Sequence, residues 1–514
     1  MMKNNRLLYL GGVLFFIDTI LVGLFSYLNK YINVDITAYI YTFFREKTGT
    51  SKDVITHAVK NMIPFIILAV VIPVFLIILF NRNKISFKIE FGRKNKKKHV
   101  IDGITLFGRC FLILCILIMF FTLRRIDKTY SIYDDYIRQR SQPTYIYDEY
   151  YVNPNDVEIQ GENTNNLILI YLESIETTFM SKEDGGGMDY ELLPNLRNLA
   201  ENNINFSATE GIGGFNSPSG TTWTMGALFA SESGLPFMFP IDGNQMGTDL
   251  AFASKVPTLG DILKEKNYNL EFLCGSDATF AGRSSFYKTH GDFTIFDYYT
   301  AVEKGYTDEY VWWGFDDELL YKIAKDELNT LSHEEDPFCF VMLTVDTHHI
   351  GGYVCDLCRN EYDNQYANVV SCADRQIFEF VEWLKEQDFY ENTTIVIVGD
   401  HPTMDATLIS SNLAGSNRIE DRKNNDINSN DGRYVYDCFI NSRVSTENIK
   451  NREFNTLDLF PTILASMGFE IEGERLGLGT NLFSQETTLQ EEYDYYYLND
   501  EFSKYSEYCR ENFW

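Results

Sequence analysis

The chain has 514 residues, 45% of them hydrophobic, and its 73 acidic residues outnumber its 44 lysines and arginines, giving a formal net charge of −29 at pH 7. Nucleic-acid binding needs a basic surface, so this balance excludes a nucleic-acid partner. The length is sufficient for a membrane module followed by one large globular domain.

Three apolar stretches near the N-terminus are long enough to span a bilayer: Leu7–Leu28, Met62–Phe80 and Ile104–Leu123. They predict that residues 1–123 form a transmembrane module of three helices. A cleaved signal peptide is the alternative for the first stretch. Its apolar core is too long for that, no small-residue cleavage site follows, and two further spans come after it.

Basic residues predict the orientation of these spans. The loop 81–99 is dense in lysine and arginine, which marks the cytoplasmic side of a membrane. A nucleic-acid-binding patch is the alternative interpretation, but two flanking spans favour a topology signal. The N-terminus is then cytoplasmic, and everything after about residue 124 lies outside. We therefore expect a multi-pass protein of the plasma membrane with an extracytoplasmic domain.

The remainder of the chain divides into a Tyr-rich juxtamembrane linker (124–165), a large domain (166–485) and an aromatic, acidic C-terminal tail (486–514). Within the domain, apolar strand-like runs alternate with helical patterns. The expected strands are 166–172, 269–274, 338–345, 393–399 and 434–440. The expected helices lie near 193–202, 224–232, 257–267, 283–290, 315–330, 366–387 and 456–467. This alternation predicts an α/β fold whose mostly parallel central sheet is flanked by helices. The polar segment 405–433 is expected to be a long surface loop.

A candidate nucleophile lies in the run Ser219–Ser231, where Thr224 immediately precedes a helix-forming stretch. A helix N-terminus presents unpaired N–H groups and the positive end of the helix dipole, which favour an oxyanion or a phosphate. A simple helix cap is the alternative role for a threonine at this position. Thr221 and Thr222 are close enough in sequence to compete as nucleophiles.

Candidate metal ligands follow two of the expected strands. Glu173 comes directly after 166–172, and Asp400 with His401 follows 393–399. Because ligand sites in such sheets lie beyond the carboxyl ends of the strands, these residues are expected to converge. Carboxylate and imidazole groups suit Mn²⁺, Mg²⁺ or Zn²⁺. A carboxylate that merely caps a loop is the alternative at each position.

Four segments together resemble a known family: 166–174 (NLILIYLES), 221–224 (TTWT), 344–349 (TVDTHH) and 398–401 (VGDH). They are similar to the signature blocks of membrane-anchored phosphoglycerol transferases, relatives of lipoteichoic acid synthase within the alkaline phosphatase/sulfatase superfamily. The resemblance is greatest to the branch that decorates periplasmic glucans. It covers roughly residues 130 to 485 and implies a sulfatase-like fold.

The resemblance also implies a reaction and its residues. Thr224 would attack phosphatidylglycerol to give a phosphoglycerol-threonine intermediate, which a hydroxyl of an extracytoplasmic glycan or polymer would resolve. Glu173, Thr224, Asp400 and His401 would hold one divalent metal ion, with manganese expected ahead of magnesium or zinc. The substrate contacts would be Arg283, His348 and the adjacent His349, through a forked guanidinium and an imidazole proton relay.

Departures from the pattern are informative. Cys274 and Ala281 stand where lipoteichoic acid synthases have glycerol contacts, which fits the glucan-modifying branch better. Cys355, Cys358 and Cys372 follow the histidine pair, and three thiols are weak evidence for zinc, which normally has four ligands. Similar cysteines in the glucan-modifying branch imply a disulfide between Cys358 and Cys372 instead. A sulfatase activity is rejected, because the Cys/Ser-x-Pro-x-Arg motif is missing at Ser217–Gly220. A phosphoethanolamine transferase, or a catalytically weak glycan-binding member of the family, remains the alternative function.

Overall fold

The computed structural model describes residues 6–31, 52–81, 88–91, 99–161, 164–238, 252–404, 408 and 432–513. These residues form two compact units, which are divided in the chain between Asp134 and Asp135. Most of the predicted loop 405–433 lies outside the described residues, and so does most of the basic loop 81–99.

The N-terminal unit contains three helices that are long and apolar enough to cross a membrane, judged by length and composition. They are α1 (Arg6–Tyr31), α3 (Lys52–Asn81) and α4 (Gly103–Tyr130), and each contains one of the predicted spans. Helix α1 packs against both α3 and α4. Between α3 and α4, strands β1 (Lys88–Phe91) and β2 (His99–Asp102) pair antiparallel.

The second unit is built on a seven-stranded sheet with the order β5-β10-β9-β4-β8-β6-β7. The strands are β4 (Asn166–Leu172), β5 (Gly214–Phe215), β6 (Asn269–Cys274), β7 (Thr294–Phe296), β8 (Phe338–Leu343), β9 (Thr393–Gly399) and β10 (Val435–Ile440). Strands β9, β4, β8, β6 and β7 are parallel, whereas β10 runs antiparallel to β9 and β5. The central strands are almost wholly apolar because both faces of the sheet are covered.

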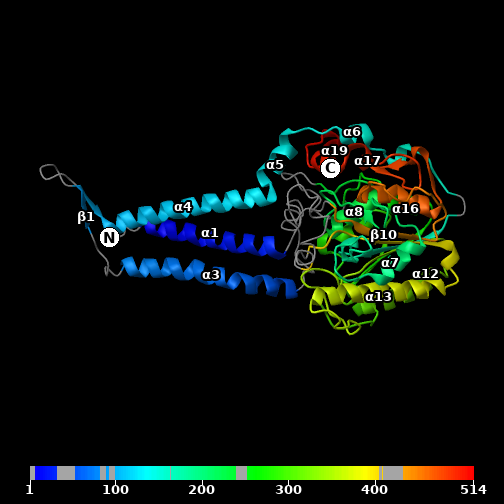
Figure 1. Ribbon diagram of the computed structural model, residues 1–514, viewed down its shortest axis with the longest axis horizontal. Helices are drawn as coiled ribbons and strands as arrows, with labels where there is room; N and C mark the ends of the chain where they lie inside the picture. The colour runs from blue at the N-terminus through cyan, green and yellow to red at the C-terminus, as the bar shows by residue number, and fades with distance from the viewer. Residues whose placement is uncertain are drawn as a thin grey trace. The chain divides into compact units, whose positions relative to one another are not determined.

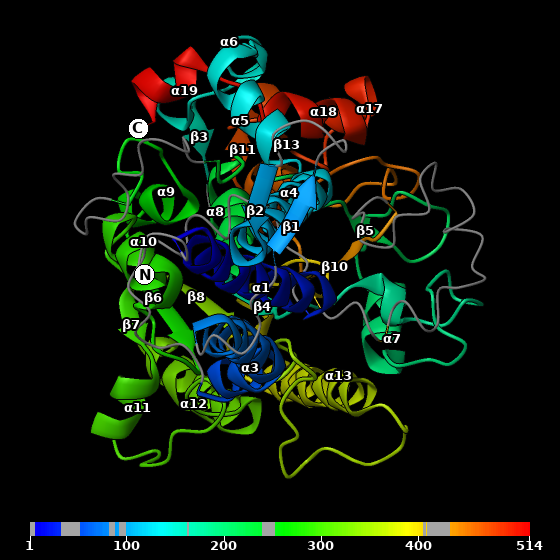
Figure 2. The ribbon, with the colours of Figure 1, turned by 90° about the vertical axis from the view of Figure 1, so that its left-hand side faces the viewer.

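Helices cover the two faces of this sheet, and Figure 1 shows α12 and α13 along one side with α8 and α16 along the other. The first group is α7 (Pro194–Asn202), α12 (Asp317–Leu331) and α13 (Gln365–Lys385). The second is α8 (Thr224–Ser233), α9 (Leu259–Glu265) and α16 (Leu459–Met467), while α10 (Arg283–Thr289) and α11 (Tyr298–Glu303) lie beside β7. Figure 2 shows the same separation, with α7, α12 and α13 below the sheet and α8 and α9 above it. The predicted α/β fold with a mostly parallel sheet is therefore confirmed.

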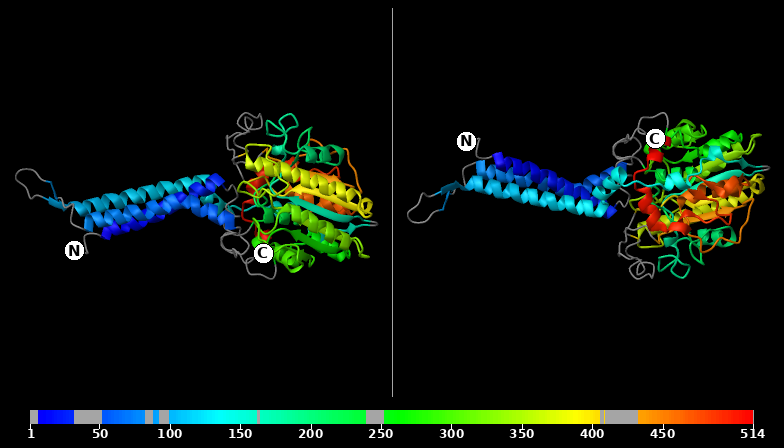
Figure 3. Two further views of the ribbon diagram at one scale, coloured as in Figure 1. Left: turned by 90° about the horizontal axis from the view of Figure 1, so that it is seen from below. Right: turned by 90° about the horizontal axis from the view of Figure 1, so that it is seen from above.

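The segments predicted as a linker and a tail both contain helices. Residues 124–165 include the end of α4 and helices α5 (Ile132–Ser141) and α6 (Ile146–Tyr150). The C-terminal segment forms α17 (Leu489–Tyr493), α18 (Tyr495–Phe502) and α19 (Glu507–Asn512), drawn in red in Figure 3. Thr144 joins the two segments, because its N–H donates to the Tyr505 carbonyl (2.9 Å) and its hydroxyl donates to Glu501. Two short antiparallel pairs complete the unit: β3 (Ile159–Gln160) with β11 (Glu470–Ile471), and β12 (Arg475–Leu476) with β13 (Gly479–Thr480).

Candidate active site

The strand register brings the candidate site residues to one edge of the sheet. Leu172, the last residue of β4, is paired in register with Gly399, the last residue of β9. Glu173 and Asp400 therefore leave the sheet side by side. The next strands in the sheet, β8 and β6, also end at this edge, and the segments that carry His348 and Arg283 follow them.

The metal-ligand candidates form a buried cluster of two carboxylates and one imidazole. The ligating atoms of Glu173, Asp400 and His401 all lie within 4.8 Å of one another. His401 Nε2 is 3.6 Å from Glu173 Oε1 and 3.4 Å from Asp400 Oδ2. His401 Nδ1 donates to the Pro402 carbonyl (2.9 Å), which leaves Nε2 to face the carboxylates. The arrangement has the donor set of a divalent-metal site.

The backbone holds Asp400 so that one carboxylate oxygen faces this cluster. Its Oδ1 accepts from the N–H groups of Ser174 (2.7 Å) and His401 (2.8 Å). Its Oδ2 is buried and has no hydrogen-bond partner among the described residues. The preceding Gly399 passes so close to the Ile175 carbonyl that an added Cβ would lie 1.9 Å from its oxygen. A buried, unpaired carboxylate oxygen is costly, and a cation at this position would compensate it.

The charges within the cluster also favour a cation. Burial and the neighbouring charge of Glu173 raise the pKa of Asp400 to about 7. Burial also raises the pKa of Glu173, but the imidazoles of His348 and His401 outweigh it and hold that pKa below its usual value. Burial lowers the pKa of His401, but the two carboxylates outweigh burial and raise it. A divalent ion would keep both carboxylates ionised and the imidazole neutral.

Thr224 is the first residue of α8, and its hydroxyl reaches the cluster. It donates to Glu173 Oε2 (3.2 Å), and it lies 3.4 Å from His401 Nε2. Gly226 allows the tight turn into α8, since an added Cβ would lie 2.4 Å from the Gly220 carbonyl oxygen. The competing Thr221 hydroxyl instead donates to the Pro218 carbonyl (2.9 Å). Thr224 is therefore the threonine that the fold brings to the candidate metal ligands.

The two histidines after β8 lie beside this cluster. His348 Nδ1 donates to the His349 carbonyl (2.7 Å), and the two rings stack with centroids 4.5 Å apart. The His348 ring also packs on Trp313, with centroids 4.7 Å apart. Burial lowers the pKa of His348, although the charge of Glu173 opposes this, and burial with the neighbouring His348 holds the pKa of His349 well below its usual value. His348 is thus poised as a neutral imidazole that can carry a proton.

Arg283 is the first residue of α10 and is buried. Its guanidinium donates to the Ser276 hydroxyl and the Asp277 carbonyl, both at 2.9 Å. Its Nε is buried without a hydrogen-bond partner among the described residues. The positive charge of Arg283 also acts on His348. A fixed guanidinium with an unused donor suits a phosphate oxygen.

Sequence reasoning missed a buried ion pair behind the metal ligands. Arg433 donates to both carboxylate oxygens of Glu176, through Nε at 3.0 Å and through a terminal nitrogen, and it donates to the Thr403 carbonyl (2.9 Å). Glu176 in turn accepts from the Thr403 N–H (2.8 Å). This pair ties the segment after Glu173 to the segment after His401. A glutamate three residues after a candidate ligand was the only sequence signal for it.

The predicted disulfide between Cys358 and Cys372 is wrong for this structure, in which both are free thiols. A third thiol, Cys355, lies 3.6 Å from Cys358 and 3.8 Å from Cys372. Cys355 forms the third corner of a triangle of thiols with Cys358 and Cys372, an arrangement that spacing along the chain does not reveal.

Residues 165–469, more than half of the chain, match the family model described as Sulfatase. The chain belongs to the sulfatase family. Phosphoglycerol transferase I from Xanthomonas campestris pv. campestris (strain B100) is 30% identical over 336 residues, which cover 63% of this chain and 43% of the relative. Phosphoglycerol transferase I from Escherichia coli (strain 55989 / EAEC) is 32% identical over 256 residues, which cover 47% of this chain and 31% of the relative. The chain therefore matches less than half the length of these curated relatives.

Two solved structures are similar to this chain at low sequence identity. The integral membrane lipooligosaccharide phosphoethanolamine transferase A (EptA) from Neisseria meningitidis has a TM-score of 0.50 at 14% identity, covering 88% of this chain and 84% of its own. The lipoteichoic acid synthase LtaP from Listeria monocytogenes has a TM-score of 0.49 at 19% identity, covering 65% of this chain and 82% of its own. The first likeness shows that the two chains share a fold.

Proposed function

We propose that this protein transfers a phosphoglycerol group from phosphatidylglycerol to a hydroxyl of an extracytoplasmic glycan or polymer, with Thr224 as the covalent nucleophile. One observation carries the proposal: a helix-terminal hydroxyl lies 3.2 Å from Glu173 Oε2 and 3.4 Å from His401 Nε2. The relatives named phosphoglycerol transferase I support the transferred group. The choice of phosphatidylglycerol as the donor and of a glycan or polymer as the acceptor is also proposed.

Glu173, Asp400 and His401, together with the Thr224 hydroxyl, would hold one divalent metal ion. The orphaned Asp400 Oδ2 and the paired buried carboxylates fit such an ion. Manganese is our choice, with magnesium and zinc as the alternatives, because the set contains oxygen ligands and a single imidazole. When bound, the ion would lower the pKa of the threonine hydroxyl and offset negative charge on the phosphoryl oxygens.

The reaction would proceed in two balanced displacements at phosphorus. In the first, a bond forms between Thr224 Oγ1 and phosphorus while the bond between phosphorus and the diacylglycerol oxygen breaks. The threonine proton is lost, and the departing diacylglycerol alkoxide takes up a proton. In the second, an acceptor hydroxyl oxygen attacks phosphorus and loses its proton, the bond between phosphorus and Thr224 Oγ1 breaks, and Thr224 Oγ1 takes up a proton. The α8 N-terminus, which has no side-chain cap, directs its first N–H groups toward the charge that develops.

Arg283 and His348 would contact the substrate. The unused Nε of Arg283 can donate to a non-bridging phosphate oxygen. Because His348 donates its Nδ1 proton to a carbonyl, its Nε2 is the atom that can exchange a proton with the leaving or attacking oxygen. His349, stacked on His348, would hold that ring in place or contact the substrate directly.

The proposed location is the plasma membrane, with three spans, a cytoplasmic N-terminus and the catalytic unit outside. The three apolar helices support a membrane protein. The dense lysine and arginine of loop 81–99 supports the orientation, because such residues are retained on the cytoplasmic side. This location gives the catalytic unit access to a lipid donor in the outer leaflet.

Lipid mass spectrometry tests the donor. The full-length protein is incubated with Mn²⁺ in vesicles that contain both phosphatidylglycerol and phosphatidylethanolamine, and a Thr224→Ala variant serves as the control. Phosphatidylglycerol should be converted to diacylglycerol only by the unmodified protein. Consumption of phosphatidylethanolamine instead would replace the proposal with a phosphoethanolamine transferase. Consumption of neither lipid would favour a glycan-binding member of the family.

A further inference from the structure

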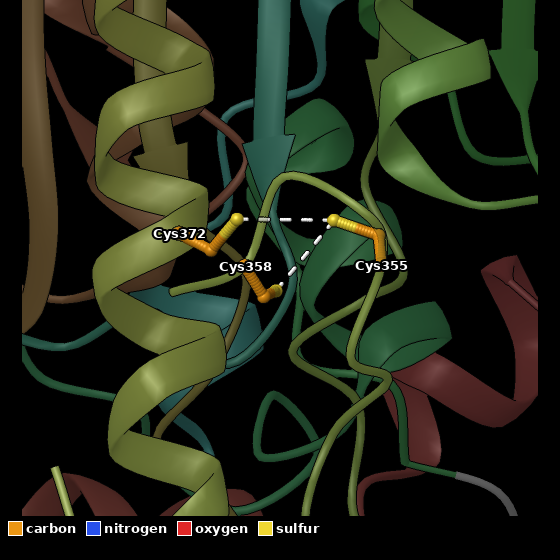
Figure 4. A group of neighbouring side chains, drawn as sticks. All are labelled: Cys355, Cys358 and Cys372. Atoms are coloured by element: carbon orange, nitrogen blue, oxygen red, sulfur yellow. Dashed lines mark hydrogen bonds between the residues drawn. The ribbon is translucent and has the colours of Figure 1, made fainter. Parts of the chain in front are cut away.

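A second cluster of potential metal ligands lies outside the candidate active site. Cys355 and Cys358 belong to the loop after β8, and Cys372 projects toward them from α13, as Figure 4 shows. Cys355 and Cys372 are buried, and Cys358 is partly buried. Their sulfur atoms all lie within 4.8 Å of one another. Nothing in the proposed phosphoglycerol transfer uses these thiols.

The spacing of the sulfur atoms matches a metal thiolate site. Cys355 Sγ is 3.6 Å from Cys358 Sγ and 3.8 Å from Cys372 Sγ. With Zn–S bonds of about 2.3 Å at tetrahedral angles, two sulfur ligands of one zinc ion lie about 3.8 Å apart. A disulfide requires about 2.05 Å between the sulfur atoms. Two edges of the triangle of sulfur atoms thus match the spacing of zinc ligands, and the third pair, Cys358 and Cys372, also lies within 4.8 Å.

Gln376, one turn after Cys372 on α13, brings its amide group close to two of the three sulfur atoms. Its Nε2 lies 3.6 Å from Cys372 Sγ and 3.8 Å from Cys355 Sγ. Its Oε1 is buried without a hydrogen-bond partner among the described residues. Because the two ends of an amide are interchangeable in shape, a half-turn of this group would place Oε1 at that position. A zinc-bound oxygen at about 2.0–2.2 Å would lie about 3.6 Å from each sulfur ligand.

The surrounding charges favour a cation in this place. The carboxylate of Asp316, which caps the start of α12, interacts electrostatically with Cys355 and with Asp356. Arg375 lies on α13 with Cys372, and its positive charge interacts electrostatically with the Cys372 thiol. The Arg375 guanidinium also forms an ion pair with Glu361 at 3.2 Å. Three thiolates around one divalent ion would carry a net charge of −1, which this partly buried arginine can offset.

We propose that Cys355, Cys358 and Cys372 bind one zinc ion, with the Gln376 amide oxygen as the fourth ligand. Thiolate-rich sites select zinc over the hard cations expected at the carboxylate cluster. The ion would fasten the loop after β8 to α13. That loop is already tied to the candidate active site, because the Tyr353 N–H donates to the Asp346 carbonyl (2.7 Å), two residues before His348. The zinc site would stabilise the segment that carries His348. The zinc proposal does not depend on the proposed function.

Metal analysis of the full-length protein, purified in detergent under reducing conditions with Zn²⁺, tests this site separately from the candidate active site. An Asp400→Ala background removes a ligand of the other cluster. We expect one zinc ion per chain in this background and none when Cys372→Ser is added. Cys509→Ser is the matched control, because Cys509 is a free cysteine outside the trio, and it should retain the zinc.

Exchange of zinc for Co²⁺ adds a signature that only thiolate ligands give. The Asp400→Ala protein and its Cys509→Ser derivative should show an intense sulfur-to-cobalt charge-transfer band. Absence of this band from both would overturn the proposal, whether or not the Cys372→Ser variant folds. A disulfide within the trio, found by non-reducing peptide mapping of protein taken directly from membranes, would also overturn it.

Discussion

Replacing Arg433 with methionine should destabilise the catalytic unit and weaken metal binding together. Arg433 and Glu176 are both buried, and they form an ion pair through two donors of the guanidinium. Methionine keeps much of the apolar stem but leaves the Glu176 carboxylate without its counter-charge. It also removes the donor to the Thr403 carbonyl, two residues after the candidate ligand His401.

The magnitude follows from the burial of the pair. Breaking a buried ion pair by removing one partner costs about 3–5 kcal/mol. For a unit of about 380 residues, Asp135–Trp514, an unfolding entropy of about 2.1 cal/mol/K per residue converts this into a fall in Tm of about 4–6 °C. Glu176 also accepts from the Thr403 N–H, so a Glu176 carboxylate that has lost Arg433 would hold the segment after His401 less firmly. Loss of groups that orient metal ligands typically lowers metal affinity by about 10–100-fold, and we expect the same here.

The assay compares thermal unfolding and Mn²⁺ titration of full-length variants in detergent. Arg452→Met is the matched control, because Arg452 is also buried and pairs with Glu491 at 2.6 Å, but it touches none of the candidate ligands. It should lose stability while keeping its metal affinity. A double variant Glu176→Gln/Arg433→Met, which has no unpaired charge, should recover part of the stability.

Two results would refute this reasoning. A fall in Tm below about 1 °C in the Arg433→Met variant would show that the buried pair contributes little net stability. A metal affinity as high as that of the Arg452→Met control would show that the pair does not position the ligand segment.

Four further outcomes are expected. Thr224→Ala should retain its metal but lose turnover by at least about 10³-fold, and unmodified protein quenched during turnover should carry a glycerophosphoryl mass on the Thr224 peptide. Asp400→Ala should lose activity and also the metal ion at the carboxylate cluster. Elemental analysis that finds full metal occupancy of this cluster in the variant would exclude Glu173, Asp400 and His401 as the ligand set. Reporter fusions at residues 90 and 160 should give cytoplasmic and extracytoplasmic signals respectively. The reverse pattern would place the catalytic unit in the cytoplasm, away from a lipid donor in the outer leaflet, and would contradict the proposed function. Burial raises the pKa of Glu232 from 4.5 to about 8. The protonated side chain therefore contributes stability that is complete below pH 4.5 and is lost as the pH rises toward 8. In this window the free energy of unfolding should fall by about 1.4 kcal/mol per pH unit, and the Glu232→Gln variant should lack this fall.

The sequence allowed the strands of the site to be predicted because buried parallel strands are continuous apolar runs. Residues 166–172 and 393–399 match β4 and β9 at both ends. The clustering of the candidate ligands was then predictable, because polar residues directly after such strands must lie at the carboxyl edge of the sheet. The family resemblance added Arg283 and His348, whose segments follow β6 and β8.

Other parts of the structure depend on contacts between distant segments and could not be predicted from local patterns. Strand β10 is as apolar as its neighbours, but it runs antiparallel to β9. No local pattern sets its direction, and Arg433, which precedes β10, pairs with Glu176 across 257 residues of sequence. The Cys355 contacts likewise depend on how one loop folds back on α13. The C-terminal segment likewise makes contacts with distant residues, since the Thr144 N–H donates to the Tyr505 carbonyl.

The burial of the cluster determines the side from which a substrate can approach. Glu173, Asp400 and His401 are almost fully buried, whereas Thr224 and His348 are partly exposed. An anionic phosphodiester is repelled by the two carboxylates unless a divalent ion offsets them, and it is attracted by Arg283 and by the N-terminus of α8. In the proposed reaction the phosphorus would therefore arrive on the threonine side, with the two carboxylates behind Thr224. Thr224 would then lie between the candidate metal ligands and the substrate, as the proposed covalent nucleophile requires.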